Sequence, residues 1–180
     1  LFDIAPSIDG EIVIVGDGLL KNELAARASN RILMLGRLTR EETLRAMSTS
    51  TALLVPSRWY EGFPMTIVEA FSCGTPVIGS NLGAIPSIVS HEQTGLIVNP
   101  ADRAGWIKAI NRLLNDPYYS AALGANARCE FEKRYDEKIA LERLECFYAE
   151  LIAKMGETSH HESSDRANVP RADWPGQSCF

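Results

Sequence analysis

The sequence has few of the features that mark secreted, disulfide-bonded or membrane-spanning proteins. Its 180 residues include four cysteines, which have neither metal-ligand spacing nor a paired framework: Cys73, Cys129, Cys146 and Cys179. No apolar segment is long enough to span a bilayer, and no signal-peptide pattern opens the chain. We therefore expect reduced thiols and a cytoplasmic protein, with peripheral association at the inner face of a membrane left open.

Positive charge and histidine are also sparse. The formal net charge is -5, and the basic residues form no cluster, which argues against nucleic acid as the main partner. A nucleotide needs only a local site and is not excluded. His160 and His161 are too isolated to form a metal site, so no metal is predicted. With 46% hydrophobic and 23% charged residues, the length suits one soluble globular domain with a substantial core.

Short apolar runs alternate with amphipathic segments along most of the chain. The patterns predict strands at residues 11–16, 32–35, 52–55, 76–79 and 96–98, and helices at 19–28, 40–48, 65–72, 86–90 and 103–115. This alternation implies right-handed crossovers and an α/β fold, a Rossmann-like doubly wound parallel sheet with helices on both faces. Two further helices are expected at 118–134 and 136–154.

The domain organisation follows from the same patterns. Residues 1–155 are expected to form one domain, and residues 156–180, which are polar and lack periodicity, a flexible tail. The first residue is Leu rather than Met, so we expect the chain to be a fragment that is truncated at its N-terminus.

Ligands of doubly wound sheets bind outside the carboxyl ends of the strands. The loops at residues 16–18, 36–40, 57–64 and 80–84 are expected to line that edge. The Gly16-Asp17-Gly18 turn could be a phosphate loop or a plain strand-to-helix turn, and the residues alone leave both open. Thr39 and Glu42 form a capping-box pattern that opens the helix at residues 40–48.

The segment at residues 56–76 carries the strongest chemical signal. Gly62 and Pro64 frame a turn, and Pro64 suits the first position of the helix that follows. The free amides at that helix start, residues 63–66, form a ready site for an anion such as phosphate. Glu61 precedes the helix and Glu69 lies one turn inside it, where their carboxylates could accept hydrogen bonds from sugar hydroxyls. For an isolated pair of glutamates, a solvated surface role is the simpler interpretation.

The wider context favours the functional interpretation of this pair. The run Glu61-Gly-Phe-Pro-Met-Thr-Ile-Val-Glu69-Ala-Phe-Ser-Cys-Gly-Thr-Pro-Val resembles the E-x7-E signature of retaining glycosyltransferases with the GT-B fold, the glycosyl transferases group 1 family. The resemblance extends from about Gly10 to about Leu151. GT-B enzymes have two Rossmann-like domains that face each other across a cleft, and this chain resembles the C-terminal, donor-binding one.

The resemblance implies an activity. A sugar would move from a nucleoside-diphosphate sugar, UDP- or GDP-linked in preference to ADP-linked, to an acceptor hydroxyl with retention at the anomeric carbon. No bound metal or other cofactor is implied. The acceptor, a glycan, lipid or small molecule, would bind an N-terminal domain that this chain lacks. The family's first strand of this domain, with basic residues that neutralise the diphosphate, would also precede Leu1, so the fragment alone is expected to be inactive or nearly so.

The resemblance also implies roles for individual residues. Glu61 would be the catalytic residue near the anomeric carbon, and Glu69 would bind the ribose hydroxyls. The remaining donor-binding positions fall into three groups: Gly62, Phe63, Pro64, Met65 and Thr66 for the sugar and diphosphate, Arg37, Leu38 and Arg40 for the base, and Gly16, Asp17 and Gly18 beside the nucleotide.

Two other functions stay open. One is a non-catalytic nucleotide-binding or scaffolding module on the same fold, against which the intact Glu61 and Glu69 argue. The other is a sugar-nucleotide hydrolase or epimerase, which would need a proton-transferring group in the cleft. His91 is the only histidine before residue 156, and it is expected on a turn at the far edge of the sheet.

Overall fold

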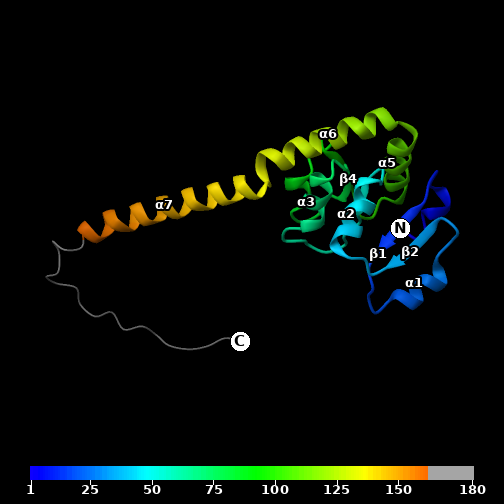
Figure 1. Cartoon of the computed structure of the whole chain (residues 1–180). Coiled ribbons are helices and arrows are strands. Elements are labelled where there is room, and N and C mark those ends of the chain that lie inside the picture. The colour runs from blue at the N-terminus through cyan, green and yellow to red at the C-terminus, as the bar shows by residue number, and fades with distance from the viewer. Residues whose placement is uncertain (162–180) are drawn as a thin grey trace. The chain divides into compact units, whose positions relative to one another are not determined.

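The computed structural model describes the backbone of residues 1–161 and the side chains of residues 1–154 (Figure 1). The chain divides into two compact units, Leu1–Asp136 and Glu137–Phe180. The first unit holds a 3-10 helix (Ala5–Ser7), strands β1 (Ile12–Val15), β2 (Ile32–Gly36), β3 (Leu53–Val55), β4 (Val77–Ser80) and β5 (Gly95–Val98), and helices α1 (Lys21–Arg27), α2 (Arg40–Ser48), α3 (Met65–Ser72), α4 (Ile85–Ile88), α5 (Arg103–Asn115) and α6 (Pro117–Arg134). The described part of the second unit is helix α7 (Glu137–His161).

All strand pairs are parallel, so the predicted α/β class is confirmed. However, the strands form two sheets rather than one. β1 pairs with β2, and β3, β4 and β5 form a separate sheet in that order. Ile12 lies opposite Ile32 in the first sheet, and Val77 opposite Gly95 in the second. The sequence patterns identified each strand, but they carried no information about which edges would meet.

Helices cover both faces of the three-stranded sheet, as expected for a doubly wound fold. One core cluster joins Trp106, Ile110 and Leu113 of α5 to residues of β1, β2, β4 and β5. The second cluster, on the other face, contains residues of α2, α3, α4 and α6, with Phe71 of α3 fully buried. All four residues of β4 are buried, which identifies it as the central strand of its sheet.

Local sequence signals account for several helix starts. The predicted capping box is present at α2, where Thr39 accepts from the Glu42 amide and the Glu42 carboxylate accepts from the Thr39 amide. Pro64 is the N-cap of α3, with φ -73° and ψ 98°, and not its first helical residue as expected. Its ring fixes φ only, and the extended ψ leaves Met65 as the first helical position.

The C-terminal part of the chain differs from the prediction. Helix α7 continues to His161, so residues 156–161, which were expected to begin a flexible tail, are helical. Gly156 does not end this helix, because a glycine inside a helix costs only about 1 kcal/mol relative to alanine. The compact first unit ends at Asp136, whereas one domain was expected over residues 1–155. The rest of the predicted tail, residues 162–180, lies outside the described residues.

Candidate functional site

The loop between β3 and α3 holds Glu61 in a defined position. The Glu61 side chain is half-buried, and its Oε1 atom accepts a hydrogen bond from the Ser57 hydroxyl at 2.9 Å. Its backbone oxygen accepts from the Ala84 amide at 3.2 Å. The carboxylate of Glu61 is therefore restrained by Ser57 of its own loop, and its backbone is restrained by Ala84 of the loop after β4.

The close contact between these two loops depends on Gly83. Its φ is +58°, a conformation that side chains rarely adopt, and a Cβ atom there would lie 2.9 Å from the backbone N and O of Glu61. Ser57 and Gly83 were not among the predicted site residues. The only sequence signal for them was their place in two loops expected at the same sheet edge, which the structure confirms.

Gly62, in contrast, has no such constraint within the chain. A Cβ atom at this position would meet nothing within 4 Å, and its φ is outside the left-handed region. Any requirement for glycine at this position would therefore have to come from a bound ligand. The next residue, Phe63, is 52% exposed, and its ring lies 6.2 Å from that of Tyr135.

The first turn of α3 presents open backbone amides. Pro64 provides no side-chain cap, and the first amide of the turn with a backbone acceptor is that of Ile67, which donates to the Pro64 oxygen at 3.0 Å. Met65 and Thr66 are both exposed. Unpaired amides together with the positive end of the helix dipole favour an anion at this point, which is where the sequence predicted one.

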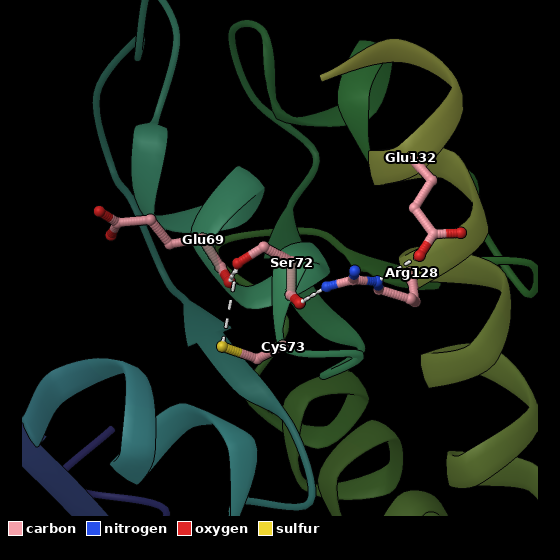
Figure 2. A network of polar contacts seen from close by, with 5 residues as sticks. All are labelled: Glu69, Ser72, Cys73, Arg128 and Glu132. Atoms are coloured by element: carbon pink, nitrogen blue, oxygen red, sulfur yellow. Dashed lines mark hydrogen bonds and ion pairs between the residues drawn. The ribbon is translucent and has the colours of Figure 1, made fainter. Parts of the chain in front are cut away.

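Glu69 lies one turn further along α3 and is half-buried. Within residues 1–161 its carboxylate has no hydrogen-bond or ion-pair partner. Figure 2 shows the carboxylate pointing away from the polar contacts at the end of the helix. It is therefore free to accept hydrogen bonds from a ligand.

Those polar contacts fix the C-terminal end of α3. The Ser72 hydroxyl donates to the Glu69 backbone oxygen at 2.7 Å. Arg128 of α6 donates to the Ser72 backbone oxygen and, through Nε, to Glu132 at 2.7 Å (Figure 2). The helix that carries Glu69 is thus anchored at the end away from the candidate site.

The loops after β1 and β2 form a second group of predicted residues. The Gly16 amide donates to the Gly36 oxygen at 2.7 Å, which joins the two loops. Asp17 forms an ion pair with Lys21 at 3.3 Å. The other predicted positions in this group surround the contact: Gly18, Arg37 and Arg40 are exposed, and Leu38 is half-buried.

Both groups of loops lie at the carboxyl ends of parallel strands, as the sequence predicted. One group contains residues 16–18 and 36–40, and the other contains residues 57–66 and 80–84. Among the described residues no hydrogen bond or ion pair joins the two groups. A cavity of about 360 Å³ lies between β1 and β3; it is lined by Thr66 of the second group and by Val15, which precedes the first group, but by no residue of 16–18 or 36–40.

The described part of the chain gives no indication of a metal site or a membrane span. No group of three or more His, Cys, Asp or Glu residues within it is placed to hold a metal ion. None of its helices combines the length and apolar character that a bilayer crossing requires. Cys73, Cys129 and Cys146 are free thiols, and Cys179 lies outside the described residues.

Comparison with known proteins decides the family. A model of the family described as Glycosyl transferases group 1 matches residues 7–130. The chain belongs to this family. The N-acetyl-alpha-D-glucosaminyl L-malate synthase of Bacillus anthracis is 28% identical over 157 residues, which are 83% of this chain and 40% of that protein. The GDP-mannose-dependent monoacylated alpha-(1-6)-phosphatidylinositol monomannoside mannosyltransferase of Corynebacterium glutamicum is 31% identical over 150 residues, 78% of this chain and 39% of that protein.

Solved structures of other proteins superpose on this chain and show the same fold. Sucrose-phosphate synthase from Thermosynechococcus elongatus superposes with a TM-score of 0.70 at 30% identity and covers 81% of this chain and 39% of its own. Anabaena HepE in complex with UDP superposes with a TM-score of 0.73 at 25% identity, over 83% of this chain and 44% of its own. The predicted family and the GT-B type of α/β fold are confirmed. The chain spans about two fifths of the length of these proteins.

Proposed function

We propose that this chain is the donor-binding part of a retaining glycosyltransferase, which moves a sugar from a nucleoside-diphosphate sugar to an acceptor hydroxyl. The observation that carries the proposal is the partner-free Glu69 carboxylate one turn beyond the open amides of α3, with Glu61 held at the mouth of the same loop. The presence of UDP in the HepE structure supports a nucleotide donor.

Different site residues bind different parts of the donor. The amides of Met65 and Thr66 bind the diphosphate, and the Glu69 carboxylate accepts hydrogen bonds from the ribose hydroxyls. Glu61 and the backbone at Gly62, Phe63 and Pro64 contact the transferred sugar. The base lies against the backbone of Leu38, with Arg37 and Arg40 beside it, and the Gly16-Asp17-Gly18 turn borders the nucleotide.

The mechanism follows from where charge develops. As the bond between the sugar and the diphosphate breaks, negative charge grows on the leaving group and positive charge on the sugar ring. The amino end of α3 stabilises the first, and the Glu61 carboxylate stabilises the second. The departing phosphate then takes the proton of the acceptor hydroxyl, which attacks from the same face and preserves the configuration. In the alternative double displacement, Glu61 would be the nucleophile.

The whole enzyme requires more than this chain. A second Rossmann-like domain would bind the acceptor, a glycan, lipid or small molecule, and the 180-residue chain alone would be inactive or nearly so. No metal or cofactor is needed for the proposed steps. We place the enzyme in the cytoplasm, with peripheral association at a membrane for a lipid acceptor. The competing proposal is a non-catalytic nucleotide-binding module, and turnover by a polypeptide with both domains would exclude it.

A nucleotide titration tests the donor site. The 180-residue chain would be titrated with UDP, GDP, ADP and orthophosphate while its amide NMR shifts are followed. We expect one nucleotide, UDP or GDP, to bind selectively and to shift the amides of Leu38 and of residues 62–69. Shifts confined to other surfaces would contradict the proposed site.

Glu69→Ala tests the role of the partner-free carboxylate. It should weaken nucleotide binding by about tenfold, because the ribose hydroxyls lose a charged acceptor, while the fold is retained. Glu41→Ala is the matched control, because Glu41 is exposed on α2 and carries no predicted role. Equal nucleotide affinity of wild type and Glu69→Ala would remove Glu69 from the site.

A further inference from the structure

The loop between β3 and α3 carries two large aromatic side chains that have no role in the donor site. The Trp59 side chain is 75% exposed and that of Tyr60 is 82% exposed. Within the first compact unit only two other aromatic side chains are exposed, Phe63 of the same loop and Tyr118 of α6. The ring of Phe63 contacts that of Tyr135. Among the described residues, neither Trp59 nor Tyr60 has a ring, cation or hydrogen-bond partner. Large apolar side chains that gather in one place on a protein surface mark a site of interaction, whereas scattered ones need no explanation.

The backbone that carries these two side chains is restrained from both ends. The Ser57 hydroxyl donates to Glu61 Oε1 at 2.9 Å, which closes the loop around Trp59. The backbone also packs against Gly83, where a Cβ atom would lie 3.2 Å from the Cα of Tyr60 and 2.9 Å from the backbone N of Glu61. The aromatic pair is therefore held at a fixed place beside the Glu61 carboxylate, so the surface is organised before any ligand binds.

The place of this pair next to Glu61 determines which part of the reaction it can reach. Under the proposed function, Glu61 lies beside the anomeric carbon, where the acceptor hydroxyl attacks. Two residues of extended chain span about 7 Å, so the Cα atoms of Trp59 and Tyr60 lie no farther than this from that of Glu61. The donor is assigned to residues 62–69, which follow Glu61. The two rings that precede Glu61 are thus within reach of the acceptor.

The chemistry of the two side chains favours a sugar as the group that they bind. A pyranose ring presents C–H groups on one face, which pack on an aromatic ring, and hydroxyls around its rim. The unpaired indole N–H of Trp59 can donate to such a hydroxyl, and the Tyr60 hydroxyl can donate or accept. An anionic lipid surface, by contrast, attracts clusters of basic residues. Arg58 is the only Lys or Arg between residues 46 and 102, and the chain has a net charge of -5, so this surface does not suit an anionic bilayer.

We propose that Trp59 and Tyr60 form an acceptor platform, on which an uncharged sugar ring stacks while its hydroxyl attacks beside Glu61. The platform rests on the proposed function for the place of the anomeric carbon. It narrows that function, because the group that accepts the transferred sugar is then itself a sugar, either free or at the end of a longer molecule. The two side chains hold and orient the acceptor and form no bond to it, and their restrained backbone lowers the entropic cost of that orientation.

Titration of the 180-residue chain with simple sugars tests the platform. The probes are the methyl α-pyranosides of glucose, galactose and mannose, and glycerol serves as a polyol that has hydroxyls but no ring face. Binding is followed through the indole N–H signal of Trp59 in NMR spectra, which Trp59→Phe distinguishes from those of Trp106 and Trp174. We expect at least one pyranoside to shift this signal with a saturable curve and glycerol to leave it in place. Saturating nucleoside diphosphate should not compete, because the two ligands occupy different parts of the site.

Single substitutions define the contribution of each ring. Trp59→Ala and Tyr60→Ala should each lower the affinity for the pyranoside by at least about fivefold, which is the low end of the loss when a ring that stacks on a nucleic-acid base is removed. Trp59→Phe keeps an aromatic face and should lose less. None of these variants should change the affinity for the nucleotide. Tyr118→Ala, which removes a ring that is 90% exposed on α6, is the matched control and should change neither affinity.

Nucleotide titrations of the same samples distinguish failure of the platform from failure of the proposed function. Selective nucleotide binding without a pyranoside shift at Trp59 would overturn the platform and leave the donor site in place. A saturable pyranoside shift at Trp59 without nucleotide binding would support the sugar site and contradict the donor site. Weaker nucleotide binding by Trp59→Ala would assign the ring to the donor and overturn the platform. An equal response to glycerol, or binding to phosphatidylglycerol vesicles that Trp59→Ala abolishes, would also overturn it.

Discussion

At the residue scale, Ser57 restrains the side chain of Glu61, the proposed catalytic residue. Its hydroxyl donates to Glu61 Oε1 at 2.9 Å, and both residues belong to the same loop. Without this hydrogen bond the carboxylate could adopt other rotamers, and holding it in one position would cost free energy when the sugar binds. Ser57 is therefore a positioning residue whose effect should be limited to the sugar part of the donor.

Ser57→Ala should separate sugar binding from nucleotide binding. We expect the affinity of the chain for a nucleotide sugar with the base it selects to fall by about threefold to tenfold, the value of one hydrogen bond, while its affinity for the corresponding nucleoside diphosphate stays the same. Calorimetric titration with both ligands measures this difference. Ser87→Ala, which removes an exposed hydroxyl bonded to the Ala84 oxygen at 2.7 Å, is the control. An equal loss of affinity for both ligands would show that Ser57 supports the loop as a whole.

Gly83 and Gly62 offer a matched pair of glycines near Glu61. Gly83→Ala should destabilise the chain by about 2 kcal/mol, because alanine is strained at positive φ and its Cβ would press on the Glu61 backbone. Gly62→Ala should change stability by less than about 0.5 kcal/mol, because its Cβ meets no neighbour. Urea unfolding of the two variants checks both values. A stable Gly83→Ala variant would mean that the two loops do not pack as described.

At the scale of the element, helix α2 shows how a local signal fixes a helix start. The Glu42 carboxylate accepts hydrogen bonds from both the amide and the hydroxyl of Thr39 at 2.8 Å. The bond from the Thr39 amide is the main cause that lowers the pKa of Glu42, and the bond from the hydroxyl adds to it. Both bonds favour the ionised form, so they stabilise the folded state at neutral pH.

The lowered pKa of Glu42 makes part of the free energy of unfolding depend on pH. Because the folded pKa of Glu42 lies below its unfolded value, its contribution is present above the unfolded pKa and is lost as pH falls through the folded pKa. We therefore expect Glu42→Gln to lower the urea midpoint at about pH 7 and to have a smaller effect at about pH 3. Glu41→Gln, in the same turn but not bonded to the cap, is the control. An effect of Glu42→Gln that is equal at both pH values would contradict the assignment.

At the scale of the whole molecule, the hydrophobic core lies within the first compact unit. Both core clusters consist of residues before Asp136, and the last member is Tyr135. We expect a chain that ends at Asp136 to unfold cooperatively and to bind the same nucleotide as the full chain. Circular dichroism and the NMR titration measure the two properties. Loss of cooperative unfolding in this shortened chain would show that residues 137–180 contribute to the fold of the first unit.

The sequence predicted most helices and strands because their signals are local. Apolar periodicity identified the strands and helices, and the Thr39 and Glu42 pair located the start of α2. The motif from Glu61 to Glu69 indicated both the family and the position of the candidate site. Ser57 and Gly83 were missed because a hydroxyl in a loop and a glycine at a turn are common, and their contacts with Glu61 appear only when the loops are folded.

The sequence by itself therefore determined the α/β class, the order of the elements and the sheet edge that carries the glutamates, because each depends on residues close together in the chain. Only the tertiary structure decided that the sheet is interrupted between β1 and β3, that Gly83 lies against Glu61, and that α7 continues past Gly156. The first two depend on which distant segments meet. The third depends on whether the stability of the helix on both sides of Gly156 exceeds the cost of glycine in a helix, about 1 kcal/mol relative to alanine. The local sequence pattern does not show which of the two is larger.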